Sequence, residues 1–201
     1  MRENDLNTEE KILLAAIELF PVKGDMTTRE IANLAGVNVA AINYHFKSKD
    51  NLMKAVEKHY SSMLYDIQNE IINDPSTTLE DKLIIWANHL MEFMFKWPAL
   101  ITVVSSLILQ DKEYNPEIIN KFFRDVELKD KIQDIISKIT GIEDIDTLNY
   151  KYIQLFSGVL GPIIFQVLPM ISGMKGIFID FSLEEERMKY IKNLVTSILD
   201  K

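Results

Sequence analysis

The stretch Thr27–Leu52 reads TTREIANLAGVNVAAINYHFKSKDNL and decides the fold of the first part of the chain. Thr27 followed three residues later by Glu30 is a capping box, which starts a short helix that Gly36 ends. A second short helix is expected over residues 38–45. Gly36 supplies the positive φ that a tight turn between two helices requires. The pattern therefore predicts a helix-turn-helix.

The outward face of the second helix carries no charge, although a solvated helix face normally carries Lys and Glu. Small side chains let a helix lie deep in the major groove, where amides bond base edges and methyl groups meet thymine. The residues of this face are Asn38, Val39, Ala40, Ala41, Asn43 and Tyr44. Groups suited to phosphate surround it, namely Thr27, Thr28, Tyr44, His45, Lys47 and Lys49. A helical hairpin inside an ordinary bundle would explain neither feature.

Apolar side chains recur with helical period along nearly the whole chain, and sustained strand-like alternation is absent from the sequence. A first helix is expected to end at Pro21 and Gly24, and a long helix to run over residues 50–72. Further helices are expected at 79–95, 98–109, 116–139, 148–171 and 183–199. We predict an all-α fold of about nine helices, with a three-helix helix-turn-helix domain at residues 1–50 and a larger helical domain at residues 51–201.

Charge is distributed unevenly along this acidic chain. The net charge of −8 is unusual for a protein that binds nucleic acid. Residues 22–60 nevertheless hold six basic and four acidic side chains, whereas residues 61–201 hold fourteen basic and twenty-one acidic ones. A surface that faces phosphate is therefore expected near the N-terminus, and the remainder should point away from DNA.

Cysteine content and apolar runs bear on the compartment. The chain has no cysteine, and its N-terminus has no apolar signal-peptide core, so a cytoplasmic protein is expected. The uncharged run from Tyr152 to Met174 is long enough to cross a bilayer, but prolines, glycines and glutamines interrupt it. We expect a helix buried against other helices, and no membrane partner.

The stretch from residue 8 to residue 60 resembles the TetR family of bacterial repressors, and the resemblance is specific because many spacings agree at once. The matching residues are Leu19, Phe20, Gly24, Thr27, Thr28, Arg29, Glu30, Ile31, Ala32, Ala35, Gly36, Val37, Tyr44, His45, Phe46, Lys47, Ser48, Lys49 and Leu52. They cover about a quarter of the chain. The rest agrees with the family only in the number and length of its helices.

The resemblance implies contacts with DNA at matching positions. Thr28 and Lys49 would hold phosphates, and Arg29 would reach a base or a phosphate. Tyr44 and His45 would lie against the backbone, although His45 could instead pack against neighbouring helices. The residues that would face bases are Asn38, Val39, Ala40 and Ala41.

Two positions depart from the family pattern. The family often has Tyr where this chain has Asn43, so an amide that reads a base edge is expected there in place of a backbone contact. The connection between Gly24 and Thr27 is short and lacks the common aromatic residue. We expect Met26 to fill that gap.

The resemblance further implies a pocket for a small apolar effector in the larger domain, where methionine and aromatic residues are dense. The candidate ligand-binding residues are Met63, Trp86, Leu90, Phe93, Met94 and Phe123. For each of them, burial in an ordinary core is the competing interpretation.

A homodimer is expected because a protein that reads palindromic half-sites needs two-fold symmetry. The helices at 148–171 and 183–199 are the expected interface, where Gly158 would permit a close approach between helices. The candidate interface residues are Leu155, Gly158, Val159, Ile191, Leu194 and Ile198. Burial of these helices within one subunit is the alternative.

Nothing in the sequence suggests catalysis, a metal site or a cofactor. The three histidines lack metal-ligand spacing, and no glycine loop that could cradle phosphate is present. The favoured function is a repressor that a small apolar ligand releases from a palindromic operator. Two alternatives stay open: an effector-independent nucleoid or architectural DNA-binding protein, and a helical carrier or enzyme without a role on DNA.

Overall fold

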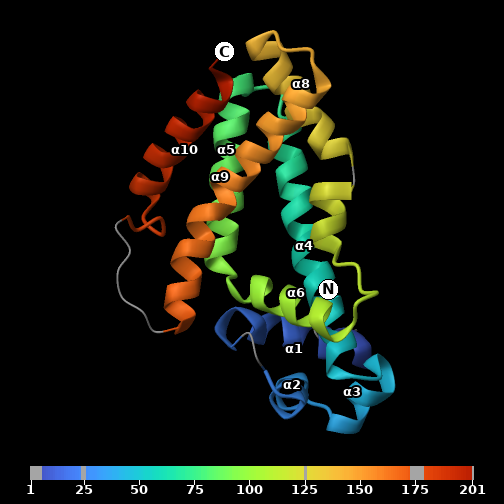
Figure 1. The fold of residues 1–201 in the computed structure, drawn as a ribbon. Helices are drawn as coiled ribbons and strands as arrows, with labels where there is room; N and C mark the ends of the chain where they lie inside the picture. Colours follow the sequence, from blue (N-terminus) through green and yellow to red (C-terminus); the bar gives the residue numbers. More distant parts are fainter. Residues whose placement is uncertain (1–5, 24–25, 125, 173–178, 201) are drawn as a thin grey trace. The chain divides into compact units, whose positions relative to one another are not determined.

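A computed structural model describes residues 6–23, 26–124, 126–172 and 179–200, which form helices and connections without a strand (Figure 1). The helices are α1 (Thr8–Lys23), α2 (Thr28–Ala35), α3 (Val39–Phe46), α4 (Lys49–Asn73), α5 (Leu79–Lys96), α6 (Ala99–Gln110), α7 (Glu117–Ile119), α8 (Val126–Thr140), α9 (Ile145–Ser172) and α10 (Glu184–Leu199). A π-helix spans Asn120–Arg124. The predicted all-α fold is confirmed.

The chain divides into two compact units, and each unit combines two separate stretches of sequence. The first unit holds Met1–Met63 and Trp97–Asn120, and the second holds Leu64–Lys96 and Lys121–Lys201. Helix α4 continues without a break from the stretch that ends at Met63 into the stretch that begins at Leu64. Residues 1–50, the predicted helix-turn-helix domain, lie within the first unit, which also holds α6, a helix that contacts α1.

In the first unit, α1, α2 and α3 contact one another around the start of α4 (Figure 1). The core is aromatic at its centre: the Tyr60 ring lies 5.0 Å from that of Phe20 and 5.4 Å from that of Trp97. Met26 is fully buried, as expected for a side chain that fills the short connection before α2.

Pro21 lies inside α1 and does not end it, contrary to the prediction. A proline cannot donate its backbone nitrogen, so it leaves the carbonyl four residues earlier, that of Ile17, without its helical partner. The Tyr60 hydroxyl donates to that carbonyl at 2.9 Å. The tertiary contact thus compensates for the lost bond and lets the helix continue to Lys23, while Gly24 lies outside the described residues.

The single helix expected at 116–139 is divided into α7, the π-helix and α8. Phe122, in the π-helix, is buried, and its ring lies 5.9 Å from that of Phe156 and 6.4 Å from that of Tyr65. The Tyr152 hydroxyl also donates to the Phe122 carbonyl at 2.8 Å. These tertiary contacts hold a segment whose apolar period alone predicts an uninterrupted α-helix.

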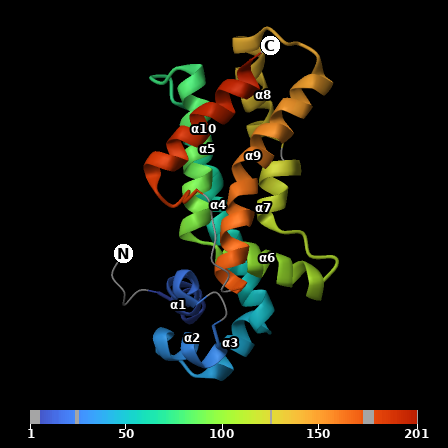
Figure 2. The ribbon, with the colours of Figure 1, turned by 60° about the vertical axis from the view of Figure 1, so that its left-hand side comes forward.

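In the second unit, α5 contacts α8, α9 and α10, and α9 also contacts α8 and α10 (Figure 2). Gly158 in α9 permits a close approach to α10, because a Cβ atom there would lie only 2.6 Å from Leu194 Cδ1. The Tyr190 hydroxyl donates to the Gly158 carbonyl at 2.7 Å. The close helix approach that Gly158 predicted is therefore present within one chain.

Most of the uncharged run expected to be buried lies in α9, and its last two residues, 173 and 174, lie outside the described part. Leu155, Val159 and Ile163 are fully buried on one side of this helix. Among the described helices, none is by itself long and apolar enough to cross a membrane, although α5 and α6, bent by 76°, pass that test as a pair.

Candidate nucleic-acid interface

Helix α2 begins at the predicted capping box. The Glu30 backbone nitrogen donates to Thr27 Oγ1 at 3.2 Å, and the Thr27 nitrogen donates to Glu30 Oε2 at 2.8 Å. The helix ends at Gly36, whose φ of 66° lies in the left-handed region that favours glycine. Thr27 Oγ1 also donates to Glu30 Oε2 at 2.9 Å, so the hydroxyl expected to hold a phosphate is engaged within the cap.

Helix α3 begins one residue later than predicted, because Asn38 is its N-cap. Asn38 Oδ1 accepts from the Ala41 nitrogen at 2.9 Å, which leaves the side-chain NH2 group as its donor toward a ligand. Ile42 and Phe46 are buried on the inner side of the helix. The core contacts of these two residues fix which face of α3 points outward.

The outward face of α3 is exposed and uncharged, as predicted. Its exposed side chains are Val39, Ala40, Asn43 and Tyr44, whereas Ala41 is half-buried. Tyr44 is 74% exposed. Lys47 Nζ donates to the Tyr44 carbonyl at 2.8 Å and lies 5.4 Å from the centre of its ring. This arrangement places a cation beside a large aromatic ring at the end of α3, where a phosphate could meet both.

The other predicted contacts surround this face unequally. Arg29 is exposed and Thr28 half-buried in the first turn of α2, and Lys49 is the half-buried first residue of α4. His45 faces α1: its Nδ1 lies 3.7 Å from Glu9 Oε2. The contact agrees with the competing interpretation of His45 as a packing residue.

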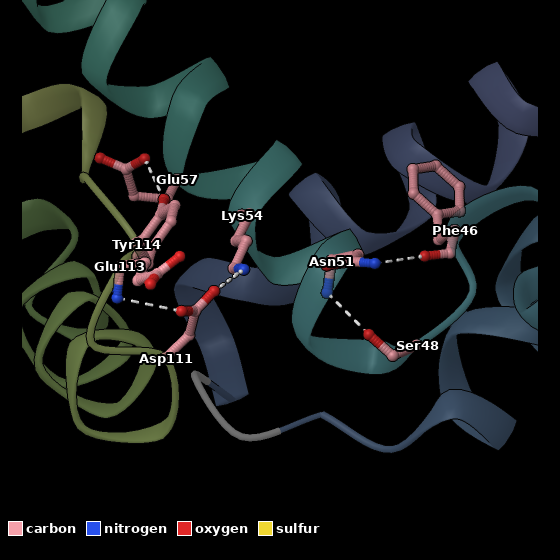
Figure 3. Close-up of polar contacts among 8 residues, drawn as sticks. All are labelled: Phe46, Ser48, Asn51, Lys54, Glu57, Asp111, Glu113 and Tyr114. Atoms are coloured by element: carbon pink, nitrogen blue, oxygen red, sulfur yellow. Dashed lines mark hydrogen bonds and ion pairs between the residues drawn. The ribbon is translucent and has the colours of Figure 1, made fainter.

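Hydrogen bonds to the start of α4 support α3 from behind (Figure 3). The Asn51 nitrogen donates to Ser48 Oγ at 3.1 Å, so Ser48 caps the start of α4. The Asn51 side chain donates through Nδ2 to the Phe46 carbonyl at 3.0 Å. One asparagine therefore joins the first turn of α4 to the last residue of α3.

Two turns further along α4, a buried carboxylate holds the segment that follows α6 (Figure 3). Glu57 is 1% exposed and accepts from the Tyr114 hydroxyl at 2.7 Å and from the Ser61 hydroxyl at 2.8 Å. It also accepts from the backbone nitrogens of Glu117 and Ile118, at 3.2 and 2.9 Å. Four donors thus satisfy one buried acid. Burial, together with the hydrogen bond to Glu57, raises the pKa of Tyr114 far above its ordinary value.

An ion pair lies between these two sites on the same helix. Lys54 Nζ donates to Asp111 Oδ2 at 2.8 Å and lies 4.8 Å from the centre of the Tyr114 ring. The hydrogen bond from Lys54 lowers the pKa of Asp111. Asn51, Lys54 and Glu57 recur at intervals of three residues and therefore share one side of α4, which links α3 to the segment at 111–118.

Residues 12–56 match the family of bacterial regulatory proteins called the tetR family, so the match includes α2, α3 and the start of α4. Over this region, the chain matches the TetR family.

Two relatives described as HTH-type transcriptional regulators agree with the match to the TetR family. The chain is 28% identical over 120 residues to the "Probable HTH-type transcriptional regulator YttP" of Bacillus subtilis, which covers 58% of each chain. It is 37% identical over 82 residues, 39% of each chain, to the HTH-type transcriptional regulatory protein RaaS of Mycobacterium tuberculosis. The chain thus matches less than two thirds of the length of either relative.

The TetR-like fold extends beyond the matched region. A "putative TetR-family transcriptional regulator" from Mesorhizobium loti superposes with a TM-score of 0.68 at 16% identity, over 96% of this chain and 95% of that chain. At that identity the likeness concerns the fold alone.

The polar supports behind the TetR-type head were not among the predicted residues. The position of Glu57 in the sequence could have indicated its burial, because Glu57 lies within an apolar stripe on α4. That stripe consists of Met53, Val56, Tyr60 and Leu64. An acid at such a position is buried and needs donors. Its main partners lie 57 to 61 residues away, and no local pattern identifies them.

The candidate effector residues lie mostly in the core. Trp86, Leu90, Phe93 and Met94 are buried within the second unit, whereas Met63 is half-buried at the end of the first. The side chain of Phe123 lies outside the described part. Among the described residues no cluster of three metal-ligating side chains occurs.

Most of the candidate dimer residues are buried by contacts within one chain. Leu155, Val159 and Ile191 are fully buried, Ile198 is nearly so, and Leu194 packs against Gly158. A side chain without exposed surface has little to offer a second copy. For these residues the burial agrees with the alternative of core helices within one subunit.

Proposed function

We propose that the protein is a transcriptional regulator that inserts α3 into the major groove of DNA. The exposed, uncharged face of α3 carries this proposal, because its small and amide side chains suit base edges and thymine methyl groups. In this arrangement Asn43 and the NH2 group of Asn38 contact bases. Arg29, Tyr44 and Lys49 contact the phosphate backbone.

A homodimer fits this function, and α9 offers a face for it. Seven residues at helical spacing on α9 are exposed or half-buried and uncharged, namely Tyr150, Ile153, Gln154, Ser157, Gly161, Ile164 and Phe165. Phe165 is 77% exposed and Tyr150 62%. An exposed, uncharged stripe of this length, with large apolar residues such as Ile153 and Phe165, indicates a partner. A second copy supplies the two-fold symmetry that a palindromic operator requires.

We further infer that a small ligand in the second unit releases the dimer from its operator, so that the protein acts as a repressor in the cytoplasm. Helix α4 supports this inference, because it begins behind α3 and continues into the second unit. By linkage, DNA must weaken ligand binding by the same factor by which the ligand weakens DNA binding.

Selection of duplexes from a random pool tests the proposal. The purified protein should enrich a palindrome whose half-sites lie about one helical turn apart. Arg29→Ala and Tyr44→Ala should each bind the selected duplex about tenfold more weakly. Arg124→Ala, which removes an exposed arginine in the second unit, is the matched control and should bind as the wild type does.

Two results would contradict the proposal. If no sequence is enriched at low salt, the α3 face does not read DNA, and the proposed function is wrong. If a sequence is enriched but the two variants bind it normally, DNA contacts a different surface.

A further inference from the structure

Two buried polar atoms in the second unit lack a hydrogen-bond partner. They are Gln68 Oε1 on α4 and Trp86 Nε1 on α5, and no other buried side-chain atom in the described part of the chain shares this condition. Both side chains are completely buried. Because an unpaired buried polar group costs free energy, each such group in a native protein calls for a physical explanation.

Gln68 is oriented by its neighbour on α5. Gln68 Nε2 lies 3.3 Å from His89 Nδ1. Burial lowers the pKa of His89, so its ring is neutral at pH 7 and Nδ1 can accept from the amide. The contact uses the amide donor of Gln68 and leaves its carbonyl oxygen as the unpaired acceptor.

Trp86 presents the complementary group close by. It precedes His89 by three residues on α5, and residues at that interval are neighbours on one face of a helix. The Trp86 ring lies 6.1 Å from the Phe156 ring, which in turn lies 6.1 Å from Tyr152 and 5.9 Å from Phe122. The unpaired donor of Trp86 therefore borders a cluster of aromatic rings, on the face of α5 that carries His89, the neighbour of Gln68.

The charges of this core limit what can bind. The buried polar side chains described in the second unit are Gln68, Gln133, Thr140 and Arg187, and none is acidic. A buried cation would thus find no counter-ion. The guanidinium of Arg187 already donates to the Asn88 side chain and to the carbonyls of Phe181 and Ser182.

We propose that the effector is a neutral, planar molecule with both a donor and an acceptor, which donates to Gln68 Oε1 and accepts from Trp86 Nε1 between α4 and α5. Only the description of this molecule as an effector rests on the proposed function. The binding at Gln68 and Trp86 does not depend on it. The aromatic cluster recognises the planar part of the molecule, and the two unpaired atoms select its polar edge. Both atoms are enclosed, so binding requires α4 to yield locally against α5, which couples occupancy to the helix that supports α3.

Four benzene derivatives of similar size separate the chemical classes. Benzamide is neutral and carries a donor and an acceptor, toluene carries neither, benzoate is an anion and benzamidine a cation. The Trp97→Phe protein keeps Trp86 as its only tryptophan, so its emission reports on this site. We expect benzamide to shift that emission, to raise Tm and to bind about tenfold more tightly than the other three compounds.

Two glutamine variants, made in the Trp97→Phe background, test the atoms involved. Gln68→Met should reduce the preference for benzamide over toluene about five- to tenfold. Gln133→Met is the matched control, because Gln133 is also buried in the second unit but donates to Asn149 Oδ1 at 2.9 Å. It should leave the preference unchanged.

Three outcomes would overturn the proposal: no response of Trp86 to any compound up to its solubility limit, an equal response to all four, or an unchanged preference in Gln68→Met. The last would indicate that water occupies the polar atoms. Duplex selection with the unliganded protein keeps the two proposals apart. Selective benzamide binding without any DNA binding would retain the ligand site and reject the regulator, and the reverse result would reject only the ligand site.

Discussion

The exposed, uncharged faces of α3 and α9 differ in the size and polarity of their side chains. The face on α3 is short and combines small residues with an amide and a tyrosine, as at Ala40, Asn43 and Tyr44. The face on α9 is longer and ends in large apolar residues, as at Ile164 and Phe165. Absence of charge alone therefore does not identify a partner. Small size with hydrogen-bonding capacity suits a DNA groove, whereas large apolar area suits another helix.

The two faces also differ in what lies behind them. Polar contacts hold the first unit beneath α3, through Asn51 at the last residue of α3 and Glu57 further along α4. Behind the α9 face lie Leu155, Val159 and Ile163, which are apolar and fully buried. Directional hydrogen bonds fix an orientation, and apolar packing supplies mainly cohesion. The first kind of support suits a face that must meet base edges in register.

Introducing charge on the α9 face should have the largest effect, which we expect on dimerisation. Ile153→Asp combined with Phe165→Asp should weaken dimerisation by at least about 100-fold, because association would bury two unpaired carboxylates from each subunit. Sedimentation equilibrium measures the change. Ile145→Asp alters an exposed residue on the opposite side of α9 and should leave the dimer intact. A double variant that stays dimeric would move the interface elsewhere.

Loss of the buried acid Glu57 in the first unit should have the second-largest effect. Glu57→Ala strands the Tyr114 hydroxyl and two backbone nitrogens, so the free energy of unfolding in urea should fall by about 3 kcal/mol. Glu70→Ala removes an exposed acid from the same helix and should change it by less than about 0.5 kcal/mol. Equal effects of the two substitutions would contradict the importance of the Glu57 contacts.

A single charge on the α3 face should act on DNA alone. Asn43→Asp places a carboxylate where the proposed groove carries phosphate, and we expect about tenfold weaker binding to the selected duplex. Its dimer should be unaffected. Asn193→Asp makes the same change at an exposed position of α10 and serves as the control. Normal DNA binding by Asn43→Asp would place the bases against another face.

The capping box of α2 should contribute a smaller amount. Thr27→Ala removes the acceptor of the Glu30 nitrogen and should reduce the free energy of unfolding by about 1 kcal/mol. Thr102→Ala changes an exposed threonine within α6 and should have little effect or stabilise slightly. If both variants unfold alike, the cap is dispensable.

The smallest effect concerns pH. Because burial lowers the pKa of His89 in the folded protein, the unfolded chain takes up a proton first, near its ordinary pKa of about 6.5. Stability should therefore be full above that pH and fall as the pH drops toward the folded pKa. Tm measured between pH 7.5 and 5.5 should show this decline, and His89→Gln should flatten it. His59→Gln, at an exposed histidine, should not.

Local signals predicted the head well. Thr27, Gly36 and Ser48 mark helix boundaries through contacts within three residues, so their neighbours in sequence are enough to identify them. The resemblance to the TetR family rests on the same local spacings. Pro21 was misinterpreted because the hydroxyl that satisfies the Ile17 carbonyl comes from Tyr60, far along the chain.

The other differences between the sequence-based predictions and the structure arise from contacts between residues far apart in the chain. Helical period identified α9 and α10, but it cannot tell which stripe faces the rest of the same chain and which faces a partner. Leu155 and Ile191 are accordingly buried within one subunit, although the sequence favoured them for an interface. The π-helix escaped prediction for a similar reason, since the residues that contact Phe122 lie outside its own segment.

The continuity of α4 has a consequence for how relatives of this chain can recombine. The helix crosses from one unit to the other at residue 63 without a break, so no loop is available to absorb an insertion there. One inserted residue would turn everything after it by about 100° and advance it by about 1.5 Å, whereas seven would restore the phase to within about 20°. Chimaeras that join a foreign effector unit at this point should thus work only when the donor and recipient helices share the same phase.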